Sequence, residues 1–293
     1  MEFDEKYNRF FFTIGLIFLS AALPACKASY PKEDIKKSVK KIFQKELGVE
    51  PETELIGQTL YVSFPLENMV SQTFELPKEV VQKLEDAMLA ITRISLSTDA
   101  NIQFTVLEAR DLKWGVQTTI IRRMQDLKGL MYWGVSKQDF DERLVLETKK
   151  IVESSTVSWQ DITLPEFMAR WVASRISLGT RANPFLGVLL GIEKVNAQLD
   201  QPNRLLTLQI EGASTSVVYS TSSLSMDLLK SSIGEQMSLI EKKYPAKSNG
   251  KSDQELRDPD WVKEIVVQDP LKKEVMRISK EEWTRSEAKT TLK

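Results

Sequence analysis

Hydrophobic positions recur along much of the chain at the spacing of amphipathic helices. Between residues 33 and 47, for example, Ile35 and Val39 fall on one face and lysines fill the opposite face. Thr163 and Glu166 form a capping-box pattern, in which each side chain can accept a hydrogen bond from the backbone of the other at the start of a helix. We expect helices at 33–47, 80–94, 116–131, 164–176 and 224–243, and the pattern at 139–152 is compatible with a helix or a strand.

Other stretches alternate between apolar and polar residues, which is typical of half-buried strands. Turn-forming residues at 200–204 and 269–270 separate pairs of such stretches and indicate β-hairpins. We expect strands at 59–64, 102–106, 192–199, 205–210, 262–267 and 273–279. Helices and strands follow one another without the regular alternation of a doubly wound sheet. The sequence therefore predicts an α+β fold, with helices packed on mainly antiparallel sheets.

The polar stretch 153–160 is a plausible boundary within the body of the chain. It suggests an N-terminal α+β lobe at 33–152 and a C-terminal α+β lobe at 157–279, followed by a polar tail at 280–293. Residues 245–260 are rich in Pro, Gly, Ser, Asn and Asp and are expected to form an exposed loop. No repeat of fixed period is visible in the sequence.

An apolar segment, Phe10 to Leu23, interrupted only by Thr13, Gly15 and Ser20, precedes this body. Its 14 residues would form a helix about 21 Å long, whereas a membrane-spanning helix has to cross a hydrocarbon core of about 30 Å. The segment therefore has the length of a signal-peptide core. An uncleaved membrane anchor is the alternative.

Leu23-Pro24-Ala25-Cys26 ends the apolar segment and resembles the lipobox of bacterial lipoproteins. The resemblance implies that residues 1–25 are a signal peptide, that cleavage falls between Ala25 and Cys26, and that Cys26 carries the lipid. Residues 26–32 would then be the lipidated tether. Cys26 is the only cysteine of the chain, and lipid attachment removes the liability of a lone free thiol in an exported protein.

Lysines are concentrated around the first expected helix. Seven of them lie between positions 27 and 45, against two acidic residues. Near a membrane, each such lysine would contribute about 1 kcal/mol of attraction to anionic headgroups. A solvated helix face packed on the domain explains the pattern equally well. The residues expected to contact the membrane surface are Lys32, Lys36, Lys37, Lys40 and Lys41.

The composition excludes several classes of chemistry. The chain has no histidine, which rules out Ser-His-Asp and Cys-His catalysis and histidine-ligated zinc. With Cys26 assigned to the lipid, thiolate chemistry and cysteine metal sites are excluded as well. The net charge is −1, so we expect no nucleic-acid partner, because phosphate binding needs a concentrated basic surface. The sequence predicts no cofactor, no metal site and no catalytic residue.

The remaining short motifs fit structural explanations better than chemical ones. Two S-x-x-K patterns lack the companion motifs of penicillin-binding enzymes, and a G-x-x-x-G pattern lies in an apolar stretch too short to span a membrane. Two carboxylate clusters could hold a hard cation, but basic neighbours favour local ion pairs. These features are Ser38–Lys41, Ser248–Lys251, Gly187–Gly191, Asp139–Glu142 beside Lys137 and Arg143, and Asp258–Asp260 beside Arg257 and Lys263.

The tryptophans divide into core and surface candidates. Trp171 has helical spacing with apolar neighbours and is expected in the core, while Trp261 and Trp283 bracket the last hairpin and could pack across it. Trp114 and Trp133 each precede a glycine and are the candidates for a turn-borne binding cleft.

Taken together, these patterns favour an exported lipoprotein, anchored to a bacterial membrane on its periplasmic or outer surface, that binds or scaffolds other envelope components without catalysis. Its partner would be an envelope protein or a glycan. Two alternatives stay open. A histidine-free enzyme that uses carboxylates or Ser and Lys predicts converging acids in a concave pocket. A carrier of small apolar ligands predicts a large apolar cavity between the lobes.

Overall fold

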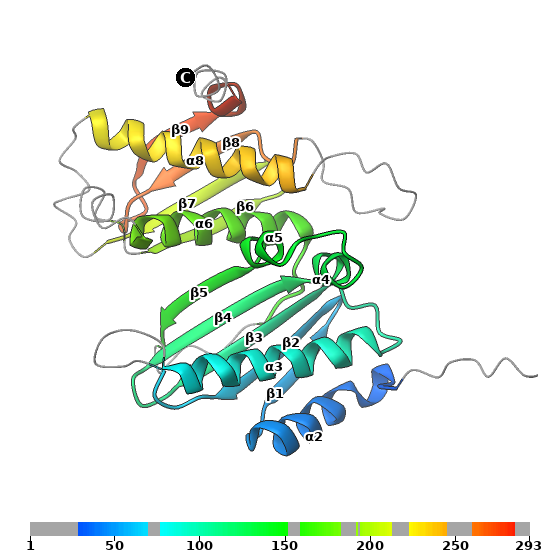
Figure 1. The fold of residues 1–293 in the computed structure, drawn as a ribbon. Helices are drawn as coiled ribbons and strands as arrows, with labels where there is room; N and C mark the ends of the chain where they lie inside the picture. Colours follow the sequence, from blue (N-terminus) through cyan, green and yellow to red (C-terminus); the bar gives the residue numbers. More distant parts are fainter. Residues whose placement is uncertain are drawn as a thin grey trace, which may run out of the picture.

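The computed structural model describes residues 29–69, 77–151, 159–182, 192, 194–212, 223–244 and 260–284. These residues form helices and two mixed, mostly antiparallel sheets, which confirms the predicted α+β fold (Figure 1). The five-stranded sheet lies within the expected N-terminal lobe, and the four-stranded sheet lies within the expected C-terminal lobe.

The five-stranded sheet keeps the order of the chain, β1-β2-β3-β4-β5. Its strands are β1 (Glu52–Ile56), β2 (Thr59–Pro65), β3 (Phe104–Asp111), β4 (Val116–Arg123) and β5 (Val145–Lys150). Strands β2 and β3 are parallel, and every other neighbouring pair is antiparallel. The parallel pair requires a crossover, which α3 provides.

The four-stranded sheet has the order β6-β7-β8-β9. Its strands are β6 (Lys194–Asp200), β7 (Leu205–Glu211), β8 (Glu264–Gln268) and β9 (Glu274–Ser279). The two antiparallel pairs are the predicted hairpins, and the parallel pair β7 and β8 is joined through α8. Both hairpin predictions are confirmed.

The long helices lie where the apolar periodicity predicts them. The helical elements are η1 (Lys32–Asp34), α2 (Ile35–Leu47), α3 (Lys78–Leu96), α4 (Met124–Met131), α5 (Lys137–Glu142), α6 (Leu164–Ala182) and α8 (Ser223–Lys243). The capping box of α6 is confirmed: Thr163 N donates to Glu166 Oε2 at 2.9 Å, and Glu166 N donates to Thr163 Oγ1 at 3.4 Å. Within the part of the chain that the structure describes, no helix is long and apolar enough to cross a membrane.

The prediction of one helix over 116–131 is wrong for its first half, because residues 116–123 form β4. Every side chain from Gln117 to Arg122 is buried, so the strand shows no apolar–polar alternation. The ambiguous stretch 139–152 contains both the end of α5 and all of β5. Strand β1 was not expected from the sequence at all.

The two halves of the chain repeat one topology. Elements α2-β1-β2-α3-β3-β4 and α6-β6-β7-α8-β8-β9 follow the same order, and in both the middle strand pair is parallel and the outer pairs are antiparallel. Strand β5 and the short helices α4 and α5 are additions to the first copy. The sequence shows no fixed period because the connections between matching elements differ in length.

Helices and sheets alternate in layers (Figure 1). Helices α2 and α3 pack on one face of the five-stranded sheet, where Val62 and Leu107 are buried. Helix α6 packs on the opposite face of that sheet, and with α8 it also covers one face of the four-stranded sheet. Side chains from both sheets therefore share one core around α6.

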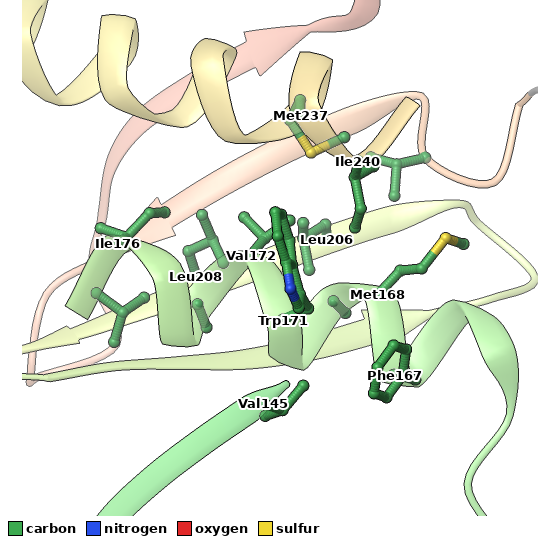
Figure 2. Close-up of a cluster of buried hydrophobic side chains, with 14 of the residues drawn as sticks. Val145, Phe167, Met168, Trp171, Val172, Ile176, Leu206, Leu208, Met237 and Ile240 are labelled. Carbon is green, nitrogen blue, oxygen red and sulfur yellow. The ribbon is translucent and has the colours of Figure 1, made fainter. Parts of the chain in front are cut away.

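Trp171 lies at the centre of this shared core (Figure 2). It is fully buried, as predicted, and its Nε1 donates to the carbonyl oxygen of Glu142 at 2.8 Å. Val145 of β5 and Leu206 of β7 reach the same core from the two sheets. Trp261 and Trp283 are also buried in it, which confirms that they pack near the last hairpin; Trp283 lies within the stretch expected to be a polar tail.

Candidate functional site

Helix α6 lies between the edges of the two sheets, since β5 ends the five-stranded sheet and β6 begins the four-stranded sheet. Ser174 Oγ accepts a hydrogen bond from Leu146 N at 3.1 Å and donates to Leu146 O at 2.8 Å. Ser177 Oγ accepts from Val195 N at 2.9 Å. Two serines about one helical turn apart thus bond to outward-facing backbone groups, Ser174 to those of Leu146 on the edge of β5 and Ser177 to that of Val195 on the edge of β6.

Beyond these serines, the edges of β5 and β6 have no partner strand within the described residues. Val195 N points away from β7 toward α6, and the alternation of an antiparallel ladder places the backbone of Ala197 and Leu199 in the same direction. Thr148 continues the open edge of β5 in the same way. Among the described residues, none pairs with the outward N–H and C=O groups of these three positions. Unpaired strand edges of this kind readily accept another chain.

A groove of about 550 Å³ opens between the two edges, within the range of ligand-binding clefts. Helix α6 provides its floor, β5 and β6 its sides, and the segment before α6 together with Tyr61 closes one end. Most of the side chains that line it are polar or charged, unlike the large apolar cavity expected for a carrier. The lining residues are Tyr61, Glu147, Lys149, Gln160–Ile162, Glu166, Ala169, Arg170 and Lys194–Leu199.

Arg170 is held rigidly in the floor of the groove. Its guanidinium donates to Glu147 twice, from Nε at 2.8 Å and from Nη2 at 2.6 Å. This two-point geometry fixes both side chains. Burial alone would lower the pKa of Arg170, but the hydrogen bonds and charge of Glu147 outweigh it and raise that pKa. Arg170 is therefore a fixed cation that joins α6 to β5.

Aromatic stacking closes one end of the groove. The rings of Tyr61 and Trp159 lie 5.4 Å apart at an angle of 14°, and the Tyr61 hydroxyl donates to the carbonyl oxygen of Gln160. Burial raises the pKa of Tyr61 to about 12, although the positive charge of Arg170 acts in the opposite direction. Tyr61 is therefore neutral at physiological pH and serves as a hydrogen-bonded wall.

Asp161 ties the segment before α6 to the first hairpin. Its Oδ1 accepts from Gln58 N at 3.0 Å and from Thr59 Oγ1 at 2.8 Å. Gly57 makes this close approach feasible: its φ is 56°, and a Cβ atom there would lie 2.0 Å from Asp161 Oδ2. The turn between β1 and β2 thus positions one end of the groove.

The chemistry of the groove favours binding. Its carboxylates, Glu147, Asp161 and Glu166, each accept hydrogen bonds from neighbouring protein groups. In the described ranges no group of three or more potential metal ligands occurs. Lys194 Nζ lies 3.9 Å from Glu211 Oε2, and Lys149 is exposed on the opposite side of the groove. The groove therefore presents open backbone groups between two ammonium groups.

The residues predicted from the sequence lie elsewhere. Cys26 and Ala25 fall outside the described residues. Five lysines, Lys32, Lys36, Lys37, Lys40 and Lys41, are exposed on η1 and α2, away from the groove. Lys36 Nζ lies 2.5 Å from Glu54 Oε1, and Lys40 pairs with Glu50, so part of this basic face is engaged within the protein.

The two tryptophans considered for a cleft are not brought together. Trp114 is 57% exposed in the turn before β4, and Trp133 is 94% exposed in the loop after α4. Trp114 precedes β4, which is about 23 Å long, and Trp133 follows α4, which begins at the far end of that strand. They therefore do not line one site.

The carboxylate clusters form ion pairs, as expected, but with partners partly different from those predicted. Asp139 accepts from Arg143 Nη2 at 2.8 Å and also contacts Lys243, which lies far away in the sequence. Asp260 accepts from Lys280 Nζ at 2.7 Å. Ser38 and Lys41 lie on α2 and away from the groove, whereas Asp258, Ser248–Lys251 and Gly187–Gly191 lie outside the described residues.

Sequence reasoning missed the groove. A signal was present in α6, where Ser174 and Ser177 lie among apolar residues such as Val172 and Ile176, and Arg170 directly precedes Trp171. Polar groups on a buried helix need partners, and this requirement could have marked the face that meets the strand edges. Which strands that face meets depends on the tertiary arrangement and cannot be predicted from the helix alone.

Comparison with known proteins gives no relative: no family model, no curated protein and no solved structure matches the chain.

Proposed function

We propose that the protein is a bacterial envelope lipoprotein, anchored through Cys26, whose groove between β5 and β6 binds an extended polypeptide segment of an envelope partner. The proposed anchor rests on the lipobox-like residues Leu23 to Cys26. The proposed binding role rests on the open strand edges in a groove between two sheets. The protein would then act as a tethered, non-catalytic binding protein.

The observation that carries the binding role is the backbone of Ala197 and Leu199. These residues repeat every second position along β6, about 7 Å apart, which is the spacing of backbone groups on one side of an extended chain. A segment added to β6 would pair with them by main-chain hydrogen bonds. A glycan lacks a matching alternation of N–H and C=O groups, so a polypeptide is favoured.

The charges around the groove favour an acidic segment. The carboxylates that line it already accept hydrogen bonds within the protein, whereas Lys149 is exposed beside the edge of β5; Lys194, whose ammonium lies 3.9 Å from Glu211, begins β6. Opposite charges would increase the rate of association and bias the choice of partner. Neutral or acidic sequences with strand-forming residues are expected to bind, and basic ones are not.

A proline at position 197 tests this proposal directly. The Ala197 N–H points into the groove and not toward β7, so Ala197→Pro removes the donor without interrupting the ladder of the sheet. Ala197→Val is the matched control, because it keeps the donor and favours a strand. Linear peptides selected from a random displayed library against the wild-type protein should bind Ala197→Val and lose at least tenfold in affinity for Ala197→Pro.

Two results would contradict the binding role. One is that no peptide is enriched on the wild-type protein over an unrelated control protein. The other is that the enriched peptides bind Ala197→Pro as tightly as they bind Ala197→Val. A circular dichroism spectrum shared by the three proteins confirms that the comparison concerns the groove and not the fold. Enrichment of glycans but not of peptides from a parallel array would assign the groove to a carbohydrate.

A further inference from the structure

An exposed apolar tip joins α4 to α5. Met131, Tyr132 and Trp133 are consecutive and are 52%, 79% and 94% exposed. Trp133 has a φ of 62°, a left-handed conformation that residues with a side chain rarely adopt. A soluble surface gains nothing from three consecutive large apolar side chains, so this loop is a candidate contact surface.

The tip is fixed to the fold at its base. Gly134 N and Val135 N both donate to the carbonyl oxygen of Gly129, at 2.8 and 3.1 Å. Gly129 lies close to Val135, since a Cβ atom at position 129 would come within 2.8 Å of Val135 Cγ2. Helix α5 continues into the core through Phe140, which is buried. The aromatic side chains are thus presented by an anchored loop.

The tip lies at the end of the five-stranded sheet where the described chain begins. Tyr30 N donates to Ser97 O at 3.2 Å, just after α3, and the connection from α3 leads to Gln103. At that same end Met124 N, the first residue of α4, donates to Gln103 O at 2.7 Å. Figure 1 shows both α4 and the start of α2 at the right-hand end of the five-stranded sheet.

The position of Cys26 limits how far this end can lie from a membrane. Three residues lie between Cys26 and Tyr30, and the four Cα–Cα steps that join them reach at most about 14 Å when extended. A lipid on Cys26 therefore holds this end of the sheet close to the headgroups. Tryptophan and tyrosine are the residues that favour the membrane–water interface, because their rings are apolar and their polar atoms stay hydrated.

We infer that Met131, Tyr132 and Trp133 insert into the interfacial region of the membrane to which Cys26 attaches, as a second, non-covalent contact. The inference rests on the proposed lipid anchor. Lys128 and Lys137 are exposed on either side of the tip and suit anionic headgroups. The body would then face the membrane with this end of its five-stranded sheet. Lys32, the first residue of η1, would lie nearest the membrane among the basic residues of η1 and α2.

Fluorescence quenching tests the inference on the full-length protein, produced with its own leader, purified from membranes and reconstituted into phosphatidylcholine–phosphatidylglycerol vesicles. Lipids brominated near the headgroup end of their acyl chains quench tryptophans that enter the interface. We expect quenching in the wild-type protein and its loss in Trp133→Phe. Trp114→Phe is the matched control, because it removes an exposed tryptophan at the opposite end of β4 and should leave the quenching unchanged.

The results separate this inference from the proposed anchor. If mass spectrometry finds a lipidated Cys26 but Trp133→Phe leaves the quenching unchanged, the anchor stands and the inserted tip is wrong. If Cys26 is unmodified, the proposed anchor fails, whatever the quenching shows. A tip that is not quenched but becomes protected from oxidation on addition of a purified partner would assign it to protein binding and would also overturn the inference.

Discussion

Lys243 Nζ lies 2.9 Å from Glu142 Oε2 and also contacts Asp139, so the end of α8 is joined to α5 in the other half of the chain. The Lys243 side chain is 8% exposed. Next to it, Arg143 Nη1 donates to Asp126 Oδ1 at 2.8 Å, and the Tyr244 hydroxyl donates to Asp126 Oδ2 at 3.1 Å. This interlobe network connects the end of α8 with α4 and α5.

Removal of the Lys243 ammonium should destabilise the protein. We expect Lys243→Met to lower the free energy of unfolding by about 1–2 kcal/mol, between the values for exposed and buried ion pairs, because the two carboxylates are partly exposed. Urea unfolding followed by tryptophan fluorescence measures the change. Lys242→Met is the control, since Lys242 is exposed, and it should change the stability by less than about 0.5 kcal/mol.

The contribution of this network should disappear in acid. Burial raises the pKa of Asp139, but hydrogen bonds from Lys243 and Arg143 outweigh this effect and lower it; the hydrogen bond from Lys243 likewise lowers the pKa of Glu142. A lowered pKa in the folded state gives stability that is present above the unfolded pKa, near 4, and is lost as the pH falls through the folded value.

The wild-type protein and Lys243→Met should therefore differ in stability at pH 7 and converge as the pH falls below about 4. Unfolding free energies measured across this range for both proteins check the expectation. A difference that stays constant down to pH 2.5, well below the ordinary carboxyl pKa of about 4, would mean that Lys243 stabilises the protein through packing and not through these two carboxylates.

A side chain at position 57 should disturb one end of the groove. Gly57→Ala places Cβ 2.0 Å from Asp161 Oδ2, so Asp161 has to move and lose its hydrogen bonds to Gln58 and Thr59. We expect the free energy of unfolding, measured by urea denaturation, to fall by about 2–4 kcal/mol, because backbone strain at position 57 adds to the cost of an unsatisfied carboxylate. Gly48→Ala is the matched control: Gly48 has a φ of 68° but no atom near its Cβ position, so only the strain, about 1 kcal/mol, should be seen.

Cys26 should determine where the protein resides. Cys26→Ser leaves the apolar segment intact but removes the thiol, so the lipid cannot be attached and the fraction of protein released from membranes by carbonate should rise. Mass spectrometry of the wild-type protein should find an N-terminal peptide that begins with a lipid-modified Cys26. An intact Met1 or an unmodified Cys26 in the membrane fraction would contradict the anchor and favour an uncleaved apolar segment.

The sequence predicts those elements whose surroundings differ on their two sides. Helices α2 and α3 each have one buried face, and β7 alternates between buried and half-buried residues, so their periodicity is visible. Strand β4 is covered by helices on one face and by α6 on the other, and its uniform burial removes the alternation. Its run Thr118 to Ile121 is rich in β-branched residues, and this propensity was the only local indication of a strand.

The groove could not be predicted because none of its parts is recognisable alone. Ser174 and Ser177 resemble ordinary helix residues until β5 and β6 are placed beside them. Lys243 and Glu142 are 101 residues apart, and local charge patterns pointed to closer partners. Such relationships follow from the tertiary arrangement, which apolar periodicity does not encode.

The core around α6 has a thermodynamic consequence. Phe104 and Val106 of the five-stranded sheet are buried against Phe167 and its neighbours on α6, a helix that opens the second copy of the repeated topology. A polypeptide that stops at residue 151 would expose that face of its sheet to water. Although the chain contains two copies of one topology, neither can reach its folded free-energy minimum alone, so heat or denaturant should unfold both in a single cooperative transition.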